Sequence, residues 1–458
     1  MADAARLADE AAHGLARNRP ELSAHIVIRG WQKFALVILL CGAATLTLEL
    51  PGASWTALAD LLSLLFLASA VFRATLALLS KPTRGSRAGT RDENLPVYAI
   101  IVPLYREANV LPRLARTLLL LDYPHDKLQI LLVVEDDDLE TLAVAQELVA
   151  RGPFELICVP AGSPRTKPRA CNYALNFARG EFTVIYDAED RPERDQLRKA
   201  VAAFGSLPPN VACLQARLNF YNARENALTK LFALDYALWF DVLLPALDRL
   251  GVPMPLGGTS NHFRTPVLRR LGGWDPFNVT EDADLGIRIA QLGQRVAMLD
   301  STTFEEAPVR IGVWLRQRSR WMKGYMQTWL VHTRQPFGLV KRAGPGGFLA
   351  FHLFIGGSVA GALATVPLWL VFLLSAVVGQ HGPTTTSLCV FALGNLLLTA
   401  LAVASPIRRG RHSLSPYGLA VPLYWAMISF AAWHGLGQLV TRPFHWEKTP
   451  HGLSQLRR

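Results

Sequence analysis

The chain carries four stretches of almost continuous apolar residues, two near its N-terminus and two near its C-terminus. They occupy residues 34–48, 61–79, 348–378 and 387–404. A helix needs roughly 20 apolar residues to cross a bilayer, and each stretch reaches that length together with its flanks. We therefore expect two transmembrane helices within residues 31–80 and two within residues 346–405.

Between these two groups the pattern changes repeatedly from strand to helix and back. Short apolar runs that are typical of buried strands occupy residues 98–105, 128–134, 155–160 and 182–187, and segments with a 3.6-residue period separate them. Continuous apolar strands joined by helices indicate a parallel sheet that is covered on both faces. We predict an α/β domain with a mostly parallel sheet over residues 95–335, and ligands should bind at the carboxyl ends of its strands.

Acidic residues follow two of the predicted strands directly. Residues 135–138 read EDDD and residues 187–190 read DAED. Because successive side chains of an extended segment point to opposite faces, Asp187 and Glu189 point the same way. A single acidic run would favour a solvated loop, but two runs at the ends of successive strands favour a site for Mg²⁺ or Mn²⁺ held by oxygen ligands.

A third acidic motif, Thr280-Glu281-Asp282, stands directly before an amphipathic helix. Acidic residues at the start of a helix also cap it and meet its dipole, so capping is the alternative to a catalytic role.

The stretch WLRQRSRWMKGYMQTWLVH, residues 314–332, combines several cations with several tryptophans. On a helix, Gln317, Arg320 and Trp321 stand at positions i, i+3 and i+4 and therefore share one face. Trp, Tyr, Lys and Arg all favour the headgroup level of a membrane, so we expect interfacial helices at residues 311–332 and, from a similar pattern, at residues 224–250.

The composition and charge fit a chain that is part membrane protein and part globular domain. Hydrophobic residues make up 51% and charged residues 18%, with a mean hydropathy of +0.22. The net charge is +11, and Lys and Arg gather at the ends of the apolar stretches, so the positive-inside rule puts the central domain in the cytoplasm. We expect no nucleic acid partner, because no basic helix lies elsewhere. The five cysteines are scattered without a CxxC pair, which indicates neither a zinc site nor a disulfide framework.

The order of these motifs resembles the membrane-embedded family 2 glycosyltransferases. EDDD, DAED, TED and QRSRW are similar to the D, DxD, TED and QxxRW signatures of cellulose, hyaluronan and chitin synthases. The resemblance covers residues 95–455, and the chain looks most like the bacterial XagB-like exopolysaccharide synthases. It implies a GT-A-type domain, inserted between the transmembrane helices, that takes a UDP-sugar as donor.

The resemblance also implies roles for individual residues. The DxD position reads Asp-Ala-Glu and is followed by Asp190, so either Glu189 or Asp190 is the second metal ligand beside Asp187. The resemblance also places Asp136 or Asp137 on the uridine and Lys167 near the nucleotide. Asp282 is implied to be the general base, with Glu281 beside it. Gln317, Arg320 and Trp321 would be the QxxRW residues, and Lys448 and Thr449, with His451, would belong to a gating loop.

The residue types agree with that chemistry without the family name. A metal and Arg320 can stabilise a diphosphate leaving group, so no general acid is required. The attacking hydroxyl must lose a proton, for which one carboxylate is enough. One base and no covalent nucleophile imply inversion at the anomeric carbon.

The C-terminal part decides the expected topology. If residues 415–440 crossed the membrane, the tail at residues 441–458 would lie on the side away from cytosolic UDP. We therefore expect an interfacial or re-entrant helix there, a cytoplasmic gating-loop-like tail, and four spans in total. The basic N-terminal arm, residues 1–30, contains no motif that indicates a function.

The leading hypothesis is a processive, inverting synthase of the inner (plasma) membrane. It would extend a β-linked glycan, with UDP-glucose as the expected donor, and its partners would be the growing glycan, the lipid bilayer and other subunits of a secretion system. One alternative is the transfer of a single sugar to a lipid acceptor. Another is an inactive nucleotide-sugar-binding subunit, which would have lost Asp282 or the QxxRW residues, whereas this chain keeps them.

Overall fold

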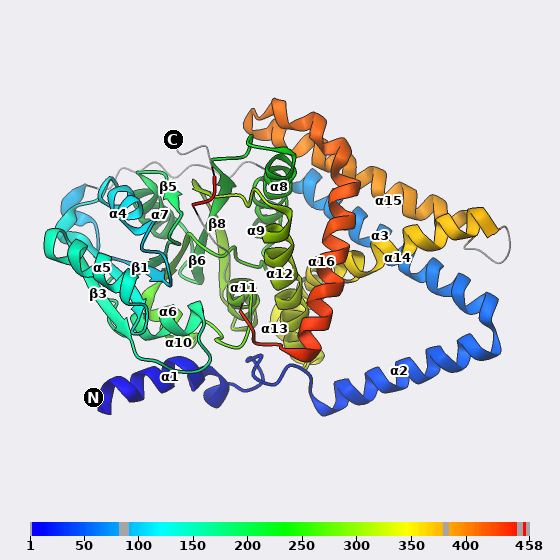
Figure 1. Cartoon of the computed structure of the whole chain (residues 1–458), viewed down its shortest axis with the longest axis horizontal. Coiled ribbons are helices and arrows are strands. Elements are labelled where there is room, and N and C mark those ends of the chain that lie inside the picture. Colours follow the sequence, from blue (N-terminus) through cyan, green and yellow to red (C-terminus); the bar gives the residue numbers. More distant parts are fainter. Residues whose placement is uncertain (1, 82–90, 379–383, 447–451, 455–458) are drawn as a thin grey trace.

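The computed structural model describes residues 2–81, 91–378, 384–446 and 452–454, and it builds the central domain around one mixed sheet. In Figure 1 the sheet fills the left half of the molecule, and long helices extend from it to the right. The strands lie in the order β3 (Phe154–Val159), β2 (Leu128–Glu135), β1 (Tyr98–Leu104), β4 (Phe182–Ile185), β7 (Asn261–Arg264), β6 (Val211–Phe220), β8 (Arg295–Glu305) and β5 (Arg191–Pro192).

Both faces of the sheet are covered, because the strands are apolar on both sides. Along β1, Ile100 and Val102 belong to one hydrophobic core and Ala99 and Ile101 to the other, as the two-residue period of a strand requires. The covering helices are α4 (Leu111–Leu119), α5 (Leu139–Arg151), α6 (Lys167–Leu175), α7 (Gln196–Ser206), α10 (Thr265–Arg270) and α11 (Glu281–Gln291).

The α/β fold predicted from the sequence is confirmed, and the sheet adds a feature that the periodicity did not indicate. β3, β2, β1 and β4 pair in parallel, as continuous apolar strands joined by helices predict. β7 then pairs antiparallel with both β4 and β6. Asn261–Arg264 is only four residues long and mostly polar, so its sequence carries no strand period that could have identified it.

Among the described residues, five helical stretches are long and apolar enough to cross a membrane. They are Gly30–Glu49, Thr56–Leu79, Pro336–Ser375, Thr385–Arg409 and His412–Thr441. The helices that form them are α2 (Gly30–Glu49), α3 (Pro51–Leu79), α13 (Pro336–Phe351), α14 (Gly357–Val378), α15 (Thr385–Ala404) and α16 (Val421–Thr441), with short π- or 3₁₀-helical turns η4 (His352–Gly356), η5 (Ser405–Arg409) and η6 (His412–Ala420). Pro367 lies inside the continuous helix α14. Non-helical backbone occurs earlier, at Gly344.

Two long helical units link the sheet to the apolar helices. One is α8 (Ala227–Leu238), which continues through the π-helical turn η3 (Trp239–Leu243) into α9 (Leu244–Leu250). The other is α12 (Ile311–His332), which packs along α16. In Figure 1, α16 runs across the direction of α14 and α15 rather than alongside them.

The N-terminal arm packs against the domain, although its sequence showed no interpretable motif. The helix α1 (Ala2–Asn18) packs on α6 and places Ala11 in the hydrophobic core. Beyond α1, the guanidinium of Arg334 donates hydrogen bonds to several backbone carbonyls, including that of Ser23 at 2.8 Å. These contacts fix the arm beneath the sheet, where Figure 1 shows it.

The helix α12 lies unusually close to its neighbours because glycines meet them. A Cβ at Gly324 would overlap the side chain of Thr280. On the other side of α12, a Cβ at Gly435 of α16 would stand 2.7 Å from the carbonyl oxygen of Ser319. A side chain at either position would push α12 away from its neighbour, so glycine is required for the observed packing.

We predict that Gly435→Ala lowers the stability of the protein by about 1–3 kcal/mol, because the added methyl group would collide with the backbone of α12. Gly437→Ala is the matched control, since a Cβ there meets nothing within 4 Å and alanine favours the helix. Thermal unfolding of both variants in detergent measures the difference. Equal melting temperatures for the two variants would contradict the packing argument.

Candidate functional site

A cavity of about 340 Å³ opens at the carboxyl ends of β1, β2 and β4. Its wall includes residues from the ends of these strands, from the starts of α6 and α11, and from one face of α12. This position is where a parallel sheet is expected to bind its ligand. The polar lining residues are Glu107, Glu135, Arg165, Thr166, Lys167, Asp187, Glu189, Thr280, Glu281, Asp282, Glu305, Gln317 and Arg320.

The acidic run after β4 separates into residues that face the cavity and one that faces inward. Asp187 and Glu189 both line the cavity. Asp190 is buried, and its Oδ2 accepts hydrogen bonds from the backbone N–H of Asp187, at 2.7 Å, and from the hydroxyl of Thr259. Asp190 therefore shapes the loop, whereas the pair with the two-residue spacing, Asp187 and Glu189, is presented to a ligand.

A single lysine accompanies these carboxylates. Lys167, at the start of α6, places its Nζ 2.5 Å from Asp187 Oδ1 and 2.8 Å from the carbonyl oxygen of Gly258. Burial disfavours the charged amine, but the neighbouring carboxylates Asp187 and Glu281 outweigh it and raise the pKa of Lys167. Lys167 therefore stays protonated and neutralises part of the acidic wall.

The remaining negative charge makes this end of the cavity suitable for a cation. Burial, and then the charge of Asp187, raise the pKa of Glu189 well above its ordinary value. Glu305, at the end of β8, has its pKa raised by burial and by Asp190, Glu189 and Asp187. Within the described ranges no three His, Cys, Asp or Glu side chains are arranged as a metal cluster. The oxygen donors and the excess of negative charge nevertheless fit a hard divalent cation at Asp187 and Glu189.

Glu281 and Asp282 form the first turn of α11, and both line the cavity. Burial, and then the charge of Asp282, raise the pKa of Glu281 to about 7. Burial also raises the pKa of Asp282. Carboxylates with raised pKa values are better proton acceptors near neutral pH than ordinary ones, so either residue can serve as a base.

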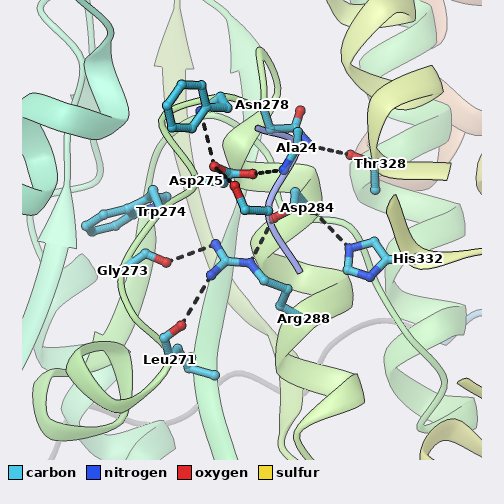
Figure 2. Close-up of polar contacts among 12 residues, drawn as sticks. Ala24, Leu271, Gly273, Trp274, Asp275, Asn278, Asp284, Arg288, Thr328 and His332 are labelled. Atoms are coloured by element: carbon cyan, nitrogen blue, oxygen red, sulfur yellow. Dashed lines mark hydrogen bonds and ion pairs between the residues drawn. The ribbon is translucent and has the colours of Figure 1, made fainter. Parts of the chain in front are cut away.

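A network of buried polar contacts fixes α11 in place (Figure 2). Two residues after Asp282, Asp284 pairs with Arg288 Nε at 2.8 Å and with His332 Nε2 at 2.9 Å. Arg288 also donates to the carbonyl oxygens of Leu271 and Gly273. Asp275 in the same region accepts hydrogen bonds from the N-terminal arm, at Ser23 Oγ and Ala24 N. The orientation of Asp282 therefore depends on ionic contacts that reach α12 and the arm.

One face of α12 contributes Gln317, Arg320 and Trp321 to the cavity wall, as their helical spacing predicts. The Arg320 guanidinium donates to the carbonyl oxygen of Val279 at 3.3 Å, and burial lowers its pKa. The carbonyl oxygen of the Gln317 side chain is buried and has no hydrogen-bond partner in the ranges that the structure describes. Gln317 and Arg320 therefore face the cavity with polar atoms that can still form hydrogen bonds.

Two other cations of this helix, Lys323 and Arg318, have partners inside the protein, whereas Arg316 is exposed. Lys323 is buried and donates to the carbonyl oxygen of His445 at 2.8 Å. Arg318 pairs with Asp235 and lies 4.7 Å from the ring centroid of Trp321. Internal partners satisfy these charges, so α12 can be buried and charged together.

The acidic run after β2 is placed differently from the expectation. Asp136 and Asp137 do not line the cavity; Asp136 accepts from the backbone N–H of Ala161, and Asp137 pairs with Arg165 at 2.6 Å. The first residue of the run, Glu135, does line it, in a buried ion pair with Arg169 at 2.6 Å. A role for Asp137 in ligand binding would therefore act through Arg165, which is part of the wall.

The tail reaches the cavity from α16. The guanidinium carbon of Arg320 lies 5.2 Å from the ring centroid of Trp446, which lines the cavity. Lys448, Thr449 and His451 lie outside the described residues. Further along the tail, the backbone N–H groups of Gly452, Leu453 and Ser454 donate hydrogen bonds to the carboxylate of Glu306.

A second cavity, of about 190 Å³, adjoins the first on the side of the apolar helices. Its wall comes from α3, α8, η3, α12, α14, α15 and α16 and is mainly apolar. The two cavities share Tyr236, Gly258, Thr280, Asp282 and Trp321. Asp282 therefore stands between a carboxylate-rich cavity and a mainly apolar one.

Several wall residues were missed by the sequence analysis. Glu305 is the last residue of β8, and the acidic pair that it forms with Glu306 was the available signal. Tyr236 lies in the amphipathic run at residues 224–250, whose period is the same whether a side chain faces a core or a cavity. Trp446 belongs to the tail motif but was not singled out from it.

Comparison with known proteins agrees with this geometry. The model of the glycosyltransferase-like family 2 matches residues 96–324, which is half of the chain. The probable glycosyltransferase YdaM of Bacillus subtilis is 24% identical over 253 residues, covering 55% of this chain and 60% of that protein. A beta-monoglucosyldiacylglycerol synthase of Synechocystis is 28% identical over 308 residues, covering 65% of this chain and 61% of that protein. The chain thus spans about three fifths of the length of these two relatives.

Among solved structures, a mannosyltransferase from Pyrobaculum calidifontis in complex with GDP-Man and Mn²⁺ has the same type of fold. It aligns with a TM-score of 0.54 at 23% identity, covering 81% of this chain and 98% of that one. This likeness concerns the fold and confirms the GT-A-like architecture. With the family model over its catalytic half, the chain belongs to the glycosyltransferase-like family 2.

Proposed function

We propose that the protein transfers one sugar, with inversion, from a UDP-sugar to the hydroxyl group of a membrane lipid. The observation that carries this proposal is the position of Asp282, which lines both cavities. The carboxylate-rich cavity suits a nucleotide diphosphate with its cation, and the mainly apolar cavity suits an acceptor that arrives from the bilayer. Asp282 is then the base at the boundary between them.

The donor end is built around Asp187 and Glu189. A divalent cation, Mg²⁺ or Mn²⁺, would be held by these two residues and would neutralise the diphosphate as it leaves. Lys167 and Arg320 supply positive charge from the opposite walls, and both can donate hydrogen bonds to phosphate oxygens. Lys167, Arg320 and the cation that Asp187 and Glu189 would hold would together stabilise the departing UDP.

The acceptor end requires removal of a proton and exclusion of water. Asp282 takes the proton of the attacking hydroxyl, and its raised pKa brings it nearer to the value at which a base works best at neutral pH. Glu281, whose pKa is about 7, stands beside it as the second candidate base. Trp321 presents its ring where the two cavities meet and would support the acceptor at the reacting carbon. Attack by the hydroxyl on the face opposite to UDP inverts the anomeric centre.

A lipid acceptor is favoured over a polymer by the apolar wall of the second cavity and by the relatives. Beta-monoglucosyldiacylglycerol synthases are among those relatives, and their name states a lipid acceptor. A processive synthase of a β-linked exopolysaccharide remains the second candidate, because the QxxRW residues Gln317, Arg320 and Trp321 resemble those of polymer synthases. Product length distinguishes the two functions.

The membrane arrangement is part of the proposal. With the catalytic domain on the cytoplasmic face, the end of α16 must return to that face, because Trp446 beyond it lines the donor cavity. An interfacial α16 satisfies this requirement and gives four crossing helices. On this topology Lys448 and Thr449 follow Trp446 on the cytoplasmic side, where the resemblance assigns them to closing over the nucleotide.

The base assignment is tested by Asp282→Asn. The amide keeps the size of the side chain but cannot accept the proton, so transfer should fall roughly 10²–10⁴-fold. UDP binding, measured by calorimetry on the same preparation, should persist. Glu281→Gln is the comparison, and it should cost less because Glu281 lines only the donor cavity. If the effects are reversed, Glu281 is the base; near-normal transfer by both variants would remove this turn of α11 from the mechanism.

The cation assignment is tested by Asp187→Ala and by chelation. Both should abolish transfer, because the diphosphate would lose its neutralising charge, and Mn²⁺ or Mg²⁺ should restore the activity of the chelated but not of the substituted protein. Asp195→Ala is the control, since Asp195 pairs with Lys199 outside the cavity. Full transfer in EDTA would exclude the cation from the mechanism.

The raised pKa values predict how transfer depends on pH. A base works only when deprotonated, and a raised pKa keeps it protonated over more of the acidic range. The value of kcat/KM should therefore decline at a higher pH than the value of about 4 expected for an ordinary aspartate, because burial raises the pKa of Asp282; a decline below about 7 would match the pKa of Glu281 instead. A pH profile of initial rates measures this, and a flat profile down to pH 5 would contradict it.

A further inference from the structure

The second cavity contains a cation that the transfer chemistry described above does not use. Arg73, on α3, is part of its wall together with mainly apolar side chains such as Phe66 and Trp239. Positively charged residues within apolar helices are costly unless they face a protein interior or a polar ligand, and they commonly mark functional sites. Arg73 therefore requires a specific explanation.

The protein contacts of Arg73 leave part of its hydrogen-bonding capacity unused. Its Nη2 donates to Ser358 Oγ at 2.7 Å, whereas its Nε is buried and has no hydrogen-bond partner within the part of the chain that the structure describes. Among the described residues no carboxylate lies within ion-pair distance of it. An arginine can donate five hydrogen bonds in a planar fork that matches phosphate oxygens.

The other charges of the second cavity are placed differently. Arg318 pairs with Asp235 and also donates to the hydroxyl of Tyr424 at 2.9 Å, so these two charges neutralise each other. Asp282 is the base assigned above and faces the donor. Arg73 remains as the positive group without a carboxylate, and it lies in the same cavity as Asp282.

The position of Arg73 along α3 matches the level of a lipid phosphate. It lies six residues before Leu79, the last residue of the helix, which is about 9 Å at the helical rise. If α3 crosses the bilayer with that end at the cytoplasmic face, Arg73 reaches the boundary between headgroups and acyl chains. The phosphate of a lipid that stays in the membrane would therefore lie close to the guanidinium of Arg73.

The wall beyond Arg73 is shaped for an apolar chain. Gly357 and Gly361 of α14 stand one helical turn apart and line the cavity beside Phe66 of α3 and Ile428 of α16. A Cβ at Gly361 would come no closer than 3.7 Å to Phe66. The apolar lining offers contact to hydrocarbon, and Arg73 offers contact to an anion.

We propose that the second cavity selects an acceptor lipid in which a phosphate diester carries a hydroxyl-bearing headgroup, with the phosphate on Arg73 and the hydroxyl at Asp282. This inference rests on the proposed transfer to a lipid. The hydroxyl oxygen forms the new bond to the anomeric carbon, the bond from that carbon to the diphosphate breaks, the proton goes to Asp282, and UDP leaves with the bonding electrons.

The experiment compares phosphatidylglycerol, which has both groups, with diacylglycerol, which has the hydroxyl alone. Each lipid is presented in phosphatidylcholine vesicles with a panel of radiolabelled UDP-sugars and Mn²⁺, and the labelled glycolipid is quantified. In Arg73→Gln, the ratio of transfer to phosphatidylglycerol over transfer to diacylglycerol should fall roughly ten- to hundredfold, the range of a hydrogen bond to a charged group. Native mass spectrometry of the detergent-solubilised protein should show a matching loss of bound phosphatidylglycerol.

Arg408→Gln is the matched control for a purely structural effect. Arg408 also holds α3, by donating to the carbonyl oxygens of Ala77 at 2.7 Å and Ser80 at 3.4 Å, but it does not line the cavity. If Arg73 were only a tether between α3 and α14, both variants would lower the melting temperature and leave the lipid ratio unchanged. That result would overturn the assignment of Arg73.

The remaining outcomes separate this inference from the proposed function. Equal transfer to both lipids, with a ratio that Arg73→Gln does not change, would overturn the phosphate preference and leave lipid transfer intact. A polymer formed from donor alone, with neither lipid labelled, would overturn both. A reduced ratio together with normal release of UDP from the donor in the absence of acceptor would support the inference at the acceptor end.

Discussion

The close packing of α12 is the constraint on which the rest of the structure depends. Gly324 lets the helix approach Thr280, at the start of α11, and Gly435 lets α16 approach it from the other side. One face of α12 thereby reaches the carboxylates of the sheet, while another meets the apolar helices. If α12 moved outward by the width of a methyl group, Arg320 would retreat from the carboxylates of the first cavity and Trp321 from the junction of the two cavities.

A second property follows from that packing, namely the accumulation of carboxylates in a partly buried space. Asp187, Glu189, Glu281 and Asp282 face one cavity with Lys167 and Arg320 as the opposing cations. Burial and like charge raise the pKa values of Glu189 and Glu281. The ionised form of these carboxylates is therefore unfavourable without additional positive charge. The strain is tolerated because the surrounding elements are fixed, α11 by the network of Asp284, Arg288 and His332.

Sequence patterns identified those parts of the molecule that depend on local spacing. The parallel strands and the shared face of Gln317, Arg320 and Trp321 follow from periods of 2 and 3.6 residues, and the structure has both. Contacts between distant segments left no such signal. The inward turn of Asp190 depends on Thr259, and the docking of the N-terminal arm depends on Asp275 and Arg334, all far away in the chain. The placement of Asp136 and Asp137 outside the cavity likewise reflects partners that no spacing predicts.

The short wall shared by the two cavities has a consequence for how this enzyme can diversify. The ends of β1, β2 and β4 line only the first cavity and the helices α3, α14 and α16 line only the second, whereas α11 and α12 contribute to both. On the proposed function, substitutions in α3, α14 and α16 would change the compound that is glycosylated and leave the strand ends at the nucleotide in place, and the reverse would also hold. Directed evolution could then treat acceptor and donor preference as independent traits.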